Sequence, residues 1–148
     1  MVGQRDLRAS KTIITCQRGL KKLAKGLFRV MNNEADLELA IRAAQKANQR
    51  LKSSTQEQGR IREVIGREWK LEVDEILEIE IFEVLKSESD WAILGEESGQ
   101  YAGDSQRMWV VDPLDGSANY SREIPFSAIS IGLWEDTVPI LGVVLEIS

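Results

Sequence analysis

The sequence contains no histidine and a single cysteine, Cys16. These absences exclude a Ser-His-Asp triad, a Cys-His pair, the common histidine-based zinc sites and cysteine-rich zinc or iron–sulfur sites within the chain. One cysteine cannot form an internal disulfide, which favours a reducing compartment, the cytoplasm. Chemistry in this chain must therefore use carboxylates, hydroxyls, lysine or a hard metal ion held by oxygen.

Long apolar runs are also missing, and the charge is unevenly distributed. No stretch approaches the roughly 18–20 uninterrupted apolar residues of a membrane-spanning helix, so no membrane partner is expected. Residues 1–30 hold eight basic residues and one acidic residue, a net charge of +7, which leaves −12 on residues 31–148 of a chain that carries −5 overall. The acidic charge of residues 31–148 argues against binding to nucleic acid, because proteins that bind nucleic acid normally present a basic surface.

The first thirty residues differ in composition from the rest of the chain. They are basic, and apolar residues recur at helical spacing over residues 20–30. They lack the compact apolar core and small-residue cleavage site of a secretory signal. A start codon assigned upstream of Met31, an organelle transit peptide and a basic surface helix all stay open. We therefore divide the sequence into a basic leader or appendage at 1–30 and one domain at 31–148.

Helices are expected first in this domain, and strands after them. One helix should begin at Asn33, a good cap, and fade near Ser53; the apolar pattern then resumes weakly over residues 61–66. A second helix is expected from Asp74, as its cap, to Ser87. Short apolar runs predict strands at residues 91–94, 108–111, 127–133 and 140–147. This order predicts an α+β fold with helices packed on a largely antiparallel sheet.

The densest chemical signal lies at residues 112–119, Asp-Pro-Leu-Asp-Gly-Ser-Ala-Asn, directly after a predicted strand. Asp112 and Asp115 on a Pro/Gly turn can point toward one centre, and Gly116 lets the backbone approach a ligand closely. The N–H groups that follow could hold phosphate oxygens, especially if they open a helix. Taken alone, the segment fits a solvated acidic turn equally well.

A second acidic pair, Glu96 and Glu97, follows the predicted strand at residues 91–94. Neighbouring strands can bring both acidic groups to one place, where carboxylates repel one another unless a cation neutralises them. Without histidine the favoured ion is hard, so Mg²⁺ is the first choice, followed by Mn²⁺ or Ca²⁺. Magnesium beside a phosphate-binding loop indicates phosphoryl chemistry.

Three blocks resemble the inositol monophosphatase family in order and spacing. They are residues 95–98 (Gly-Glu-Glu-Ser), 109–120 (Trp-Val-Val-Asp-Pro-Leu-Asp-Gly-Ser-Ala-Asn-Tyr) and 124–133 (Ile-Pro-Phe-Ser-Ala-Ile-Ser-Ile-Gly-Leu). The resemblance implies a layered α/β sandwich and a Mg²⁺-dependent phosphate monoester hydrolase. Its substrate would be an inositol phosphate or a related sugar or nucleotide phosphate. The implied mechanism is in-line attack by metal-activated water, without a covalent enzyme intermediate.

The resemblance also implies roles for individual residues. The implied metal ligands are the side chains of Glu96, Asp112 and Asp115 and the carbonyl oxygen of Leu114. The implied substrate contacts are Glu96, Leu114, Asp115, Gly116, Ser117 and Ala118, the last three through backbone N–H groups. The implied catalytic residues are Glu96 and Ser117, which would orient the attacking water, and Asp74, associated with a further metal-bound water. For Asn119, hydrogen bonding within the turn is the better interpretation.

The chain departs from the family pattern in two ways. Leu71 stands where the family usually has a threonine, and Lys70 is offset from the family's lysine. Family members are also longer, and their second half supplies another aspartate ligand, so we expect an N-terminal half. The alternatives are a truncated, catalytically silent Mg²⁺-binding fragment and a calcium-binding structural domain. The expected partner is a small phosphorylated molecule, and a homodimer stays open because family members are commonly dimers.

Overall fold

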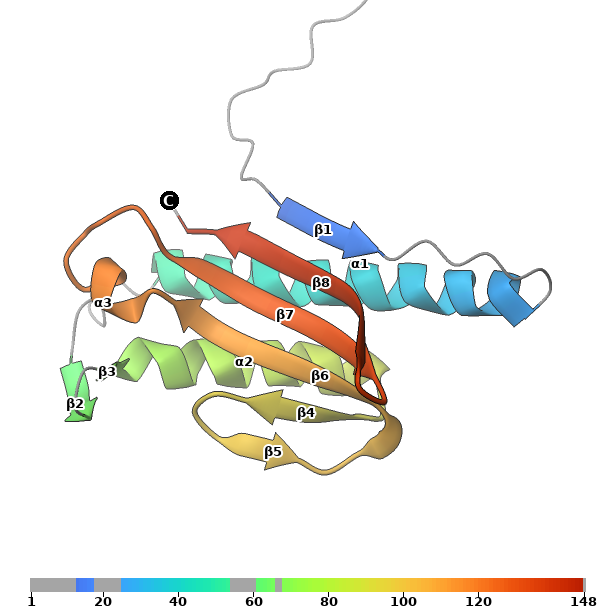
Figure 1. Ribbon diagram of the computed structural model, residues 1–148. Helices are drawn as coiled ribbons and strands as arrows, with labels where there is room; N and C mark the ends of the chain where they lie inside the picture. Colours follow the sequence, from blue (N-terminus) through green and yellow to red (C-terminus); the bar gives the residue numbers. More distant parts are fainter. Residues whose placement is uncertain (1–12, 18–24, 54–60, 66–67, 148) are drawn as a thin grey trace, which may run out of the picture.

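The computed structural model describes residues 13–17, 25–53, 61–65 and 68–147. Within them, six strands form one sheet in the order β1-β8-β7-β6-β4-β5, and β2 pairs with β3 in a separate hairpin (Figure 1). The strands are β1 (Ile13–Gln17), β2 (Ile61–Ile65), β3 (Glu68–Leu71), β4 (Trp91–Gly95), β5 (Gly99–Tyr101), β6 (Asp104–Asp115), β7 (Ala128–Glu135) and β8 (Val138–Glu146). The helices are α1 (Lys25–Ser53), α2 (Glu72–Glu88) and α3 (Ser117–Tyr120).

Neighbouring strands of the large sheet differ in their relative direction. β4 and β6 run parallel, with Gly95 opposite Val111. The pairs β1–β8, β8–β7, β7–β6 and β4–β5 are antiparallel. The expected α+β fold with a largely antiparallel sheet is therefore confirmed, and its one parallel pair contains the two strands that carry the acidic motifs.

The hydrophobic core lies between the sheet and the two long helices, which cover the same face of the sheet (Figure 1). Side chains alternate along β7, where Ile129, Ile131 and Leu133 are buried. This is the two-residue period of a strand with one face packed on a core. Trp109 of β6 is fully buried, and its indole N–H donates to the Ser89 hydroxyl at 3.1 Å. None of the described helices is both long and apolar enough to cross a membrane.

Three expectations for the helices need correction. α1 begins at Lys25, so Asn33 lies inside the helix and does not cap it. Extending a helix costs less than nucleating a new one, which outweighs the cap preference of one residue. α2 begins at Glu72, which puts Asp74 in the first turn, where a negative charge suits the helix dipole. Residues 61–65 form β2, in keeping with the strand preference of their β-branched residues.

Part of the predicted leader belongs to the described fold. β1 pairs with β8, with Ile13 opposite Leu145 and Gln17 opposite Leu141, and so it lies along the outer edge of β8. Residues 25–30 form the beginning of α1. Residues 1–12 and 18–24, which the prediction also includes, lie outside the described residues.

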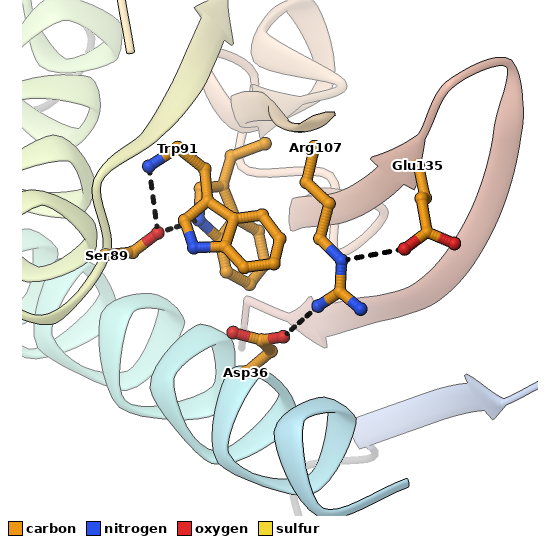
Figure 2. Close-up of polar contacts among 6 residues, drawn as sticks. Asp36, Ser89, Trp91, Arg107 and Glu135 are labelled. Atoms are coloured by element: carbon orange, nitrogen blue, oxygen red, sulfur yellow. Dashed lines mark hydrogen bonds and ion pairs between the residues drawn. The ribbon is translucent and has the colours of Figure 1, made fainter. Parts of the chain in front are cut away.

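Arg107 joins α1 to the β6–β7 pair, as Figure 2 shows. Its guanidinium contacts Asp36 at 2.7 Å and Glu135 at 3.2 Å, and its carbon lies 4.2 Å from the centre of the Trp91 ring. The arginine side chain is only 6% exposed. Burial raises the pKa of Asp36, and the charge and hydrogen bond of Arg107 counteract that rise. Because a charge with little access to water is costly without a partner, Arg107 stabilises the ionised form of Asp36.

We predict that Arg107→Met destabilises the fold by about 3 kcal/mol, since it removes a buried charge that pairs with Asp36 and Glu135, two acids that are only partly exposed. Urea denaturation measures the loss. The matched control is Arg42→Ala, which breaks an ion pair of the same 2.7 Å length with Glu88, between side chains that are 47% and 57% exposed. That pair should contribute less than about 1 kcal/mol. Equal losses in the two variants would contradict a structural role for the Arg107 cluster.

Candidate metal and phosphate site

The parallel pairing of β4 and β6 brings the two acidic motifs to the same edge of the sheet. Both strands run in one direction, and Gly95 at the end of β4 lies opposite Val111 of β6. The next residues along the two strands are Glu96 and Asp112. Because Val111 is buried against the helices and side chains alternate, Asp112 faces the opposite side of the sheet. The predicted meeting of two acid-bearing strand ends is thus present in the structure.

The pKa of Asp112 responds to burial and to both neighbouring acids. Its pKa is raised to about 7, first by burial, then by the charge of Glu96 and a hydrogen bond shared with it, and then by the charge of Asp115. The Leu114 N–H donates to Asp112 Oδ1 at 3.2 Å and opposes this rise. Asp112 thus interacts with both of the other acids. Such mutual repulsion is what a bound cation would relieve.

An irregularity in β6 lets Asp112 and Asp115 act at one place. In a regular strand, residues three apart point to opposite faces. The pairing of β6 with β7 shifts register between Asp112 and Asp115, and a bulge of this kind redirects side chains. The strand continues to Asp115, so the turn expected at Pro113 begins only at Gly116. Asp115 is exposed and lines a hollow of about 350 Å³ that also includes Phe126.

Gly116 makes the transition from β6 to the single-turn helix α3. Its φ of +80° lies in the left-handed region, and a Cβ there would lie 2.6 Å from the Phe126 carbonyl oxygen. The Gly116 carbonyl accepts the N–H groups of Asn119 at 2.8 Å and Tyr120 at 3.0 Å, so helical bonding begins there. The Asn119 side chain donates to the Phe126 carbonyl at 2.9 Å, which confirms its expected role in the turn. Glycine is therefore required here both by φ and by the close approach of residue 126.

The remaining predicted residues lie on either side of this edge. Ser117 is the first residue of α3 and is partly buried. Ala118 follows it in the same turn and is also partly buried. Asp74 is 4% exposed on α2, one helical turn before Glu78. The structure therefore groups Glu96, Asp112 and Asp115 by their interactions, and it places Asp74 on the helix behind the sheet.

Sequence reasoning missed Glu78. This acid is 2% exposed, and its two carboxylate oxygens accept the N–H groups of Glu97 at 2.9 Å and Ser98 at 2.8 Å. A signal was available, because Glu78 lies next to Leu77 and three residues before Ile81 on the apolar stripe of α2. An acidic residue at a core-facing position requires buried hydrogen-bond partners, which the sequence does not identify.

Comparison with known proteins identifies the family. The model of the inositol monophosphatase family matches residues 31–147. The chain belongs to the inositol monophosphatase family.

Similar proteins within the family include enzymes and solved structures. The chain is 35% identical over 128 residues to an inositol-1-monophosphatase of Synechocystis, an alignment that covers 81% of this chain and 43% of that protein. The structure of SuhB from Bartonella henselae aligns with a TM-score of 0.67 at 33% identity, covering 74% of this chain and 43% of SuhB. Inositol monophosphatase from Anabaena aligns with a TM-score of 0.63 at 29% identity, covering 78% of this chain and 41% of that one. The chain spans less than half the length of these relatives.

The donor chemistry of this family member suits a hard cation, because its acids and the Leu114 carbonyl offer only oxygen. The pKa of Asp112 is raised first by burial and then by the neighbouring charges of Glu96 and Asp115, which a cation would offset. As the side chains stand, no group of three or more acidic, histidine or cysteine side chains within the described residues is arranged to hold a metal ion. The fit to Mg²⁺ therefore rests on donor type and on the Glu96–Asp112–Asp115 interactions.

We predict a pH dependence of stability from the pKa of Asp112. In the folded protein the carboxyl group of Asp112 keeps its proton up to about pH 7. An aspartate in the unfolded chain releases its proton at about pH 3.9. The contribution of Asp112 to stability is therefore fully present below the unfolded pKa and is lost as pH rises through the folded value. Without divalent cations, Asp112→Asn should gain stability relative to the wild type between pH 5 and 8.

Urea unfolding in chelator measures this difference at several pH values. The exposed acid Glu38 of α1 provides the control, because Glu38→Gln should follow the wild type across the range. A wild-type protein that gained stability over Asp112→Asn as pH rose would contradict the crowding of the acids.

Proposed function

We propose that this chain carries the metal- and phosphate-binding half of a Mg²⁺-dependent phosphate monoester hydrolase. One observation supports this above the others: Glu96 and Asp112 share a hydrogen bond at the ends of two parallel strands, with Asp115 close enough to raise the pKa of Asp112 further. Membership of the inositol monophosphatase family supports phosphatase chemistry at this edge.

The residues around Asp112 would have separate roles in binding the ion and in orienting water. Glu96, Asp112, Asp115 and the Leu114 carbonyl would hold Mg²⁺. When bound, the ion would lower the pKa of the attacking water and neutralise charge on the phosphate. Glu96 and the Ser117 hydroxyl would orient that water for in-line attack. The P–O ester bond would then break: the phosphoryl group would pass to the water oxygen, and the leaving oxygen would take up a proton and depart as the alcohol.

The turn after β6 would hold the phosphate. Backbone N–H groups of Gly116, Ser117 and Ala118 stand where helical bonding has not yet begun, since the first amides accepted by the Gly116 carbonyl are those of Asn119 and Tyr120. N–H groups before a helix are suited to anion binding. The Asn119–Phe126 hydrogen bond would keep the turn in shape as the phosphate enters. Asp74 would act on a further bound water from the α2 side.

The substrate class follows from the names of relatives. One is the inositol-1-monophosphatase of Synechocystis, and another, from Aquifex aeolicus, is a fructose-1,6-bisphosphatase/inositol-1-monophosphatase that is 42% identical over 73 residues, 49% of this chain and 28% of that one. We therefore propose an inositol phosphate or related sugar phosphate as substrate. The single cysteine supports a cytoplasmic setting, and a homodimer is the assembly expected for the family.

The decisive test is Mg²⁺-dependent release of phosphate from a generic phosphate monoester. Asp115→Asn should abolish release, because it removes a charged ligand. The matched control is Asp136→Asn in the exposed β7–β8 turn, where φ is +55° and asparagine is well tolerated. Full activity in Asp115→Asn would overturn the assigned role.

Thermal unfolding separates the alternatives. If the folded chain binds Mg²⁺, millimolar Mg²⁺ should raise the melting temperature by mass action. A raised melting temperature without phosphate release would favour the truncated, silent Mg²⁺-binding fragment. Tight Ca²⁺ binding without phosphate release would favour the calcium-binding structural domain.

A further inference from the structure

Glu78 of α2 makes contacts that the proposed hydrolysis does not yet use. Its carboxylate is 2% exposed, and it accepts two consecutive backbone amides, those of Glu97 and Ser98, at 2.9 and 2.8 Å. Both amides belong to the turn between β4 and β5, which begins with Glu96. Hydrogen bonds to a charged acceptor are stronger than neutral ones, so this residue ties the turn firmly to α2.

The end of β4 is built to admit this carboxylate. A Cβ at Gly95 would overlap the Glu78 carboxylate, whose atoms are the three nearest to it. Glu78 therefore lies directly against the strand end that precedes Glu96. On the other flank of the turn, Gly99 pairs with Gly95 and has a φ of +72°. Glycine adopts this left-handed region without strain.

The two acids approach the turn from opposite sides of the sheet. Gly95 is buried on the side where Glu78 lies, whereas Glu96, the first residue of the turn, is exposed. Glu96 shares a hydrogen bond with Asp112, whose side chain faces away from the helices. Glu78 fixes the backbone from the helix side, and Glu96 faces its partner on the other side.

We propose that Glu78 is a positioning residue, whose buried carboxylate holds turn 96–98 so that the Glu96 side chain faces Asp112. This role rests on the proposed function, in which Glu96 is a metal ligand. Groups that orient metal ligands typically change metal affinity by 10- to 100-fold when they are altered. Glutamine at position 78 keeps the shape but presents an amide NH₂ to one of the two backbone N–H groups, so one hydrogen bond is lost.

The test measures Mg²⁺ affinity by calorimetry on the full chain. Glu78→Gln should weaken binding roughly tenfold. Glu83→Gln is the matched control: it removes the same charge from the same helix, where Glu83 is exposed and contacts Lys46 at 3.5 Å. Its affinity should equal that of the wild type. Amide hydrogen exchange provides a second measurement, in which Glu97 and Ser98 should exchange faster in Glu78→Gln alone.

A double-mutant cycle separates positioning from charge. Gly95→Ala displaces the Glu78 carboxylate without changing any charge, so it should also weaken Mg²⁺ binding. In the Glu78→Ala background there is no carboxylate left to displace, and Gly95→Ala should then add little further loss. Circular dichroism checks that each variant is folded. If Glu78→Gln does not fold, the Mg²⁺ affinity of Gly95→Ala provides the test instead.

The outcomes distinguish this role from the function on which it rests. If the wild type binds Mg²⁺ and Glu78→Gln binds it equally well, the positioning role is overturned and the proposed function stands. Equal losses in Glu78→Gln and Glu83→Gln would attribute the effect to charge and would also overturn it. If the wild type binds no Mg²⁺, the proposed function fails and the positioning role fails with it.

Discussion

The parallel register of β4 and β6 is the constraint on which the site depends. Gly95 opposite Val111 makes Glu96 and Asp112 the next residues at one edge of the sheet. An antiparallel pairing of the same strands would send the two motifs to opposite edges, because antiparallel strands end at opposite sides of a sheet. Every proposed step, from ion binding to the orientation of water, uses the meeting of these two acids.

Grouping like charges is unfavourable, yet the backbone holds these acids near one another. The pKa of Asp112 rises to about 7 because burial and the charges of Glu96 and Asp115 disfavour its ionised form. A bulge in β6 brings Asp115 into this group, and buried Glu78 holds the turn behind Glu96. Acids that the backbone keeps close together attract a cation. When no cation is bound, their mutual repulsion lowers the stability of the fold.

The two ends of strand β6 have different roles, one in stability and the other in the proposed chemistry. Near its start, the buried Arg107 pairs with the partly buried acids Asp36 and Glu135 and ties α1 to the sheet (Figure 2). Near its end, acids with no basic partner in the described interactions gather beside α3. The same strand thus has charge balance at one end and charge excess at the other. This arrangement allows the helices and core to offset the strain that the acidic edge introduces.

The sequence alone determined four of the strands (β4, β6, β7 and β8), the acidic motifs that follow β4 and end β6, and the oxygen-only chemistry, because two-residue periodicity, local motifs and missing histidine can all be read along the chain. It misplaced the start of α1 at Asn33 and missed β1, β2, β3 and β5, whose few residues give only a weak periodicity signal. Only tertiary structure decided that β4 and β6 are parallel, that the bulge redirects Asp115 and that Glu78 reaches turn 96–98. These features depend on contacts between residues far apart in the chain, and no local pattern encodes which partner a buried acid or a strand edge will meet.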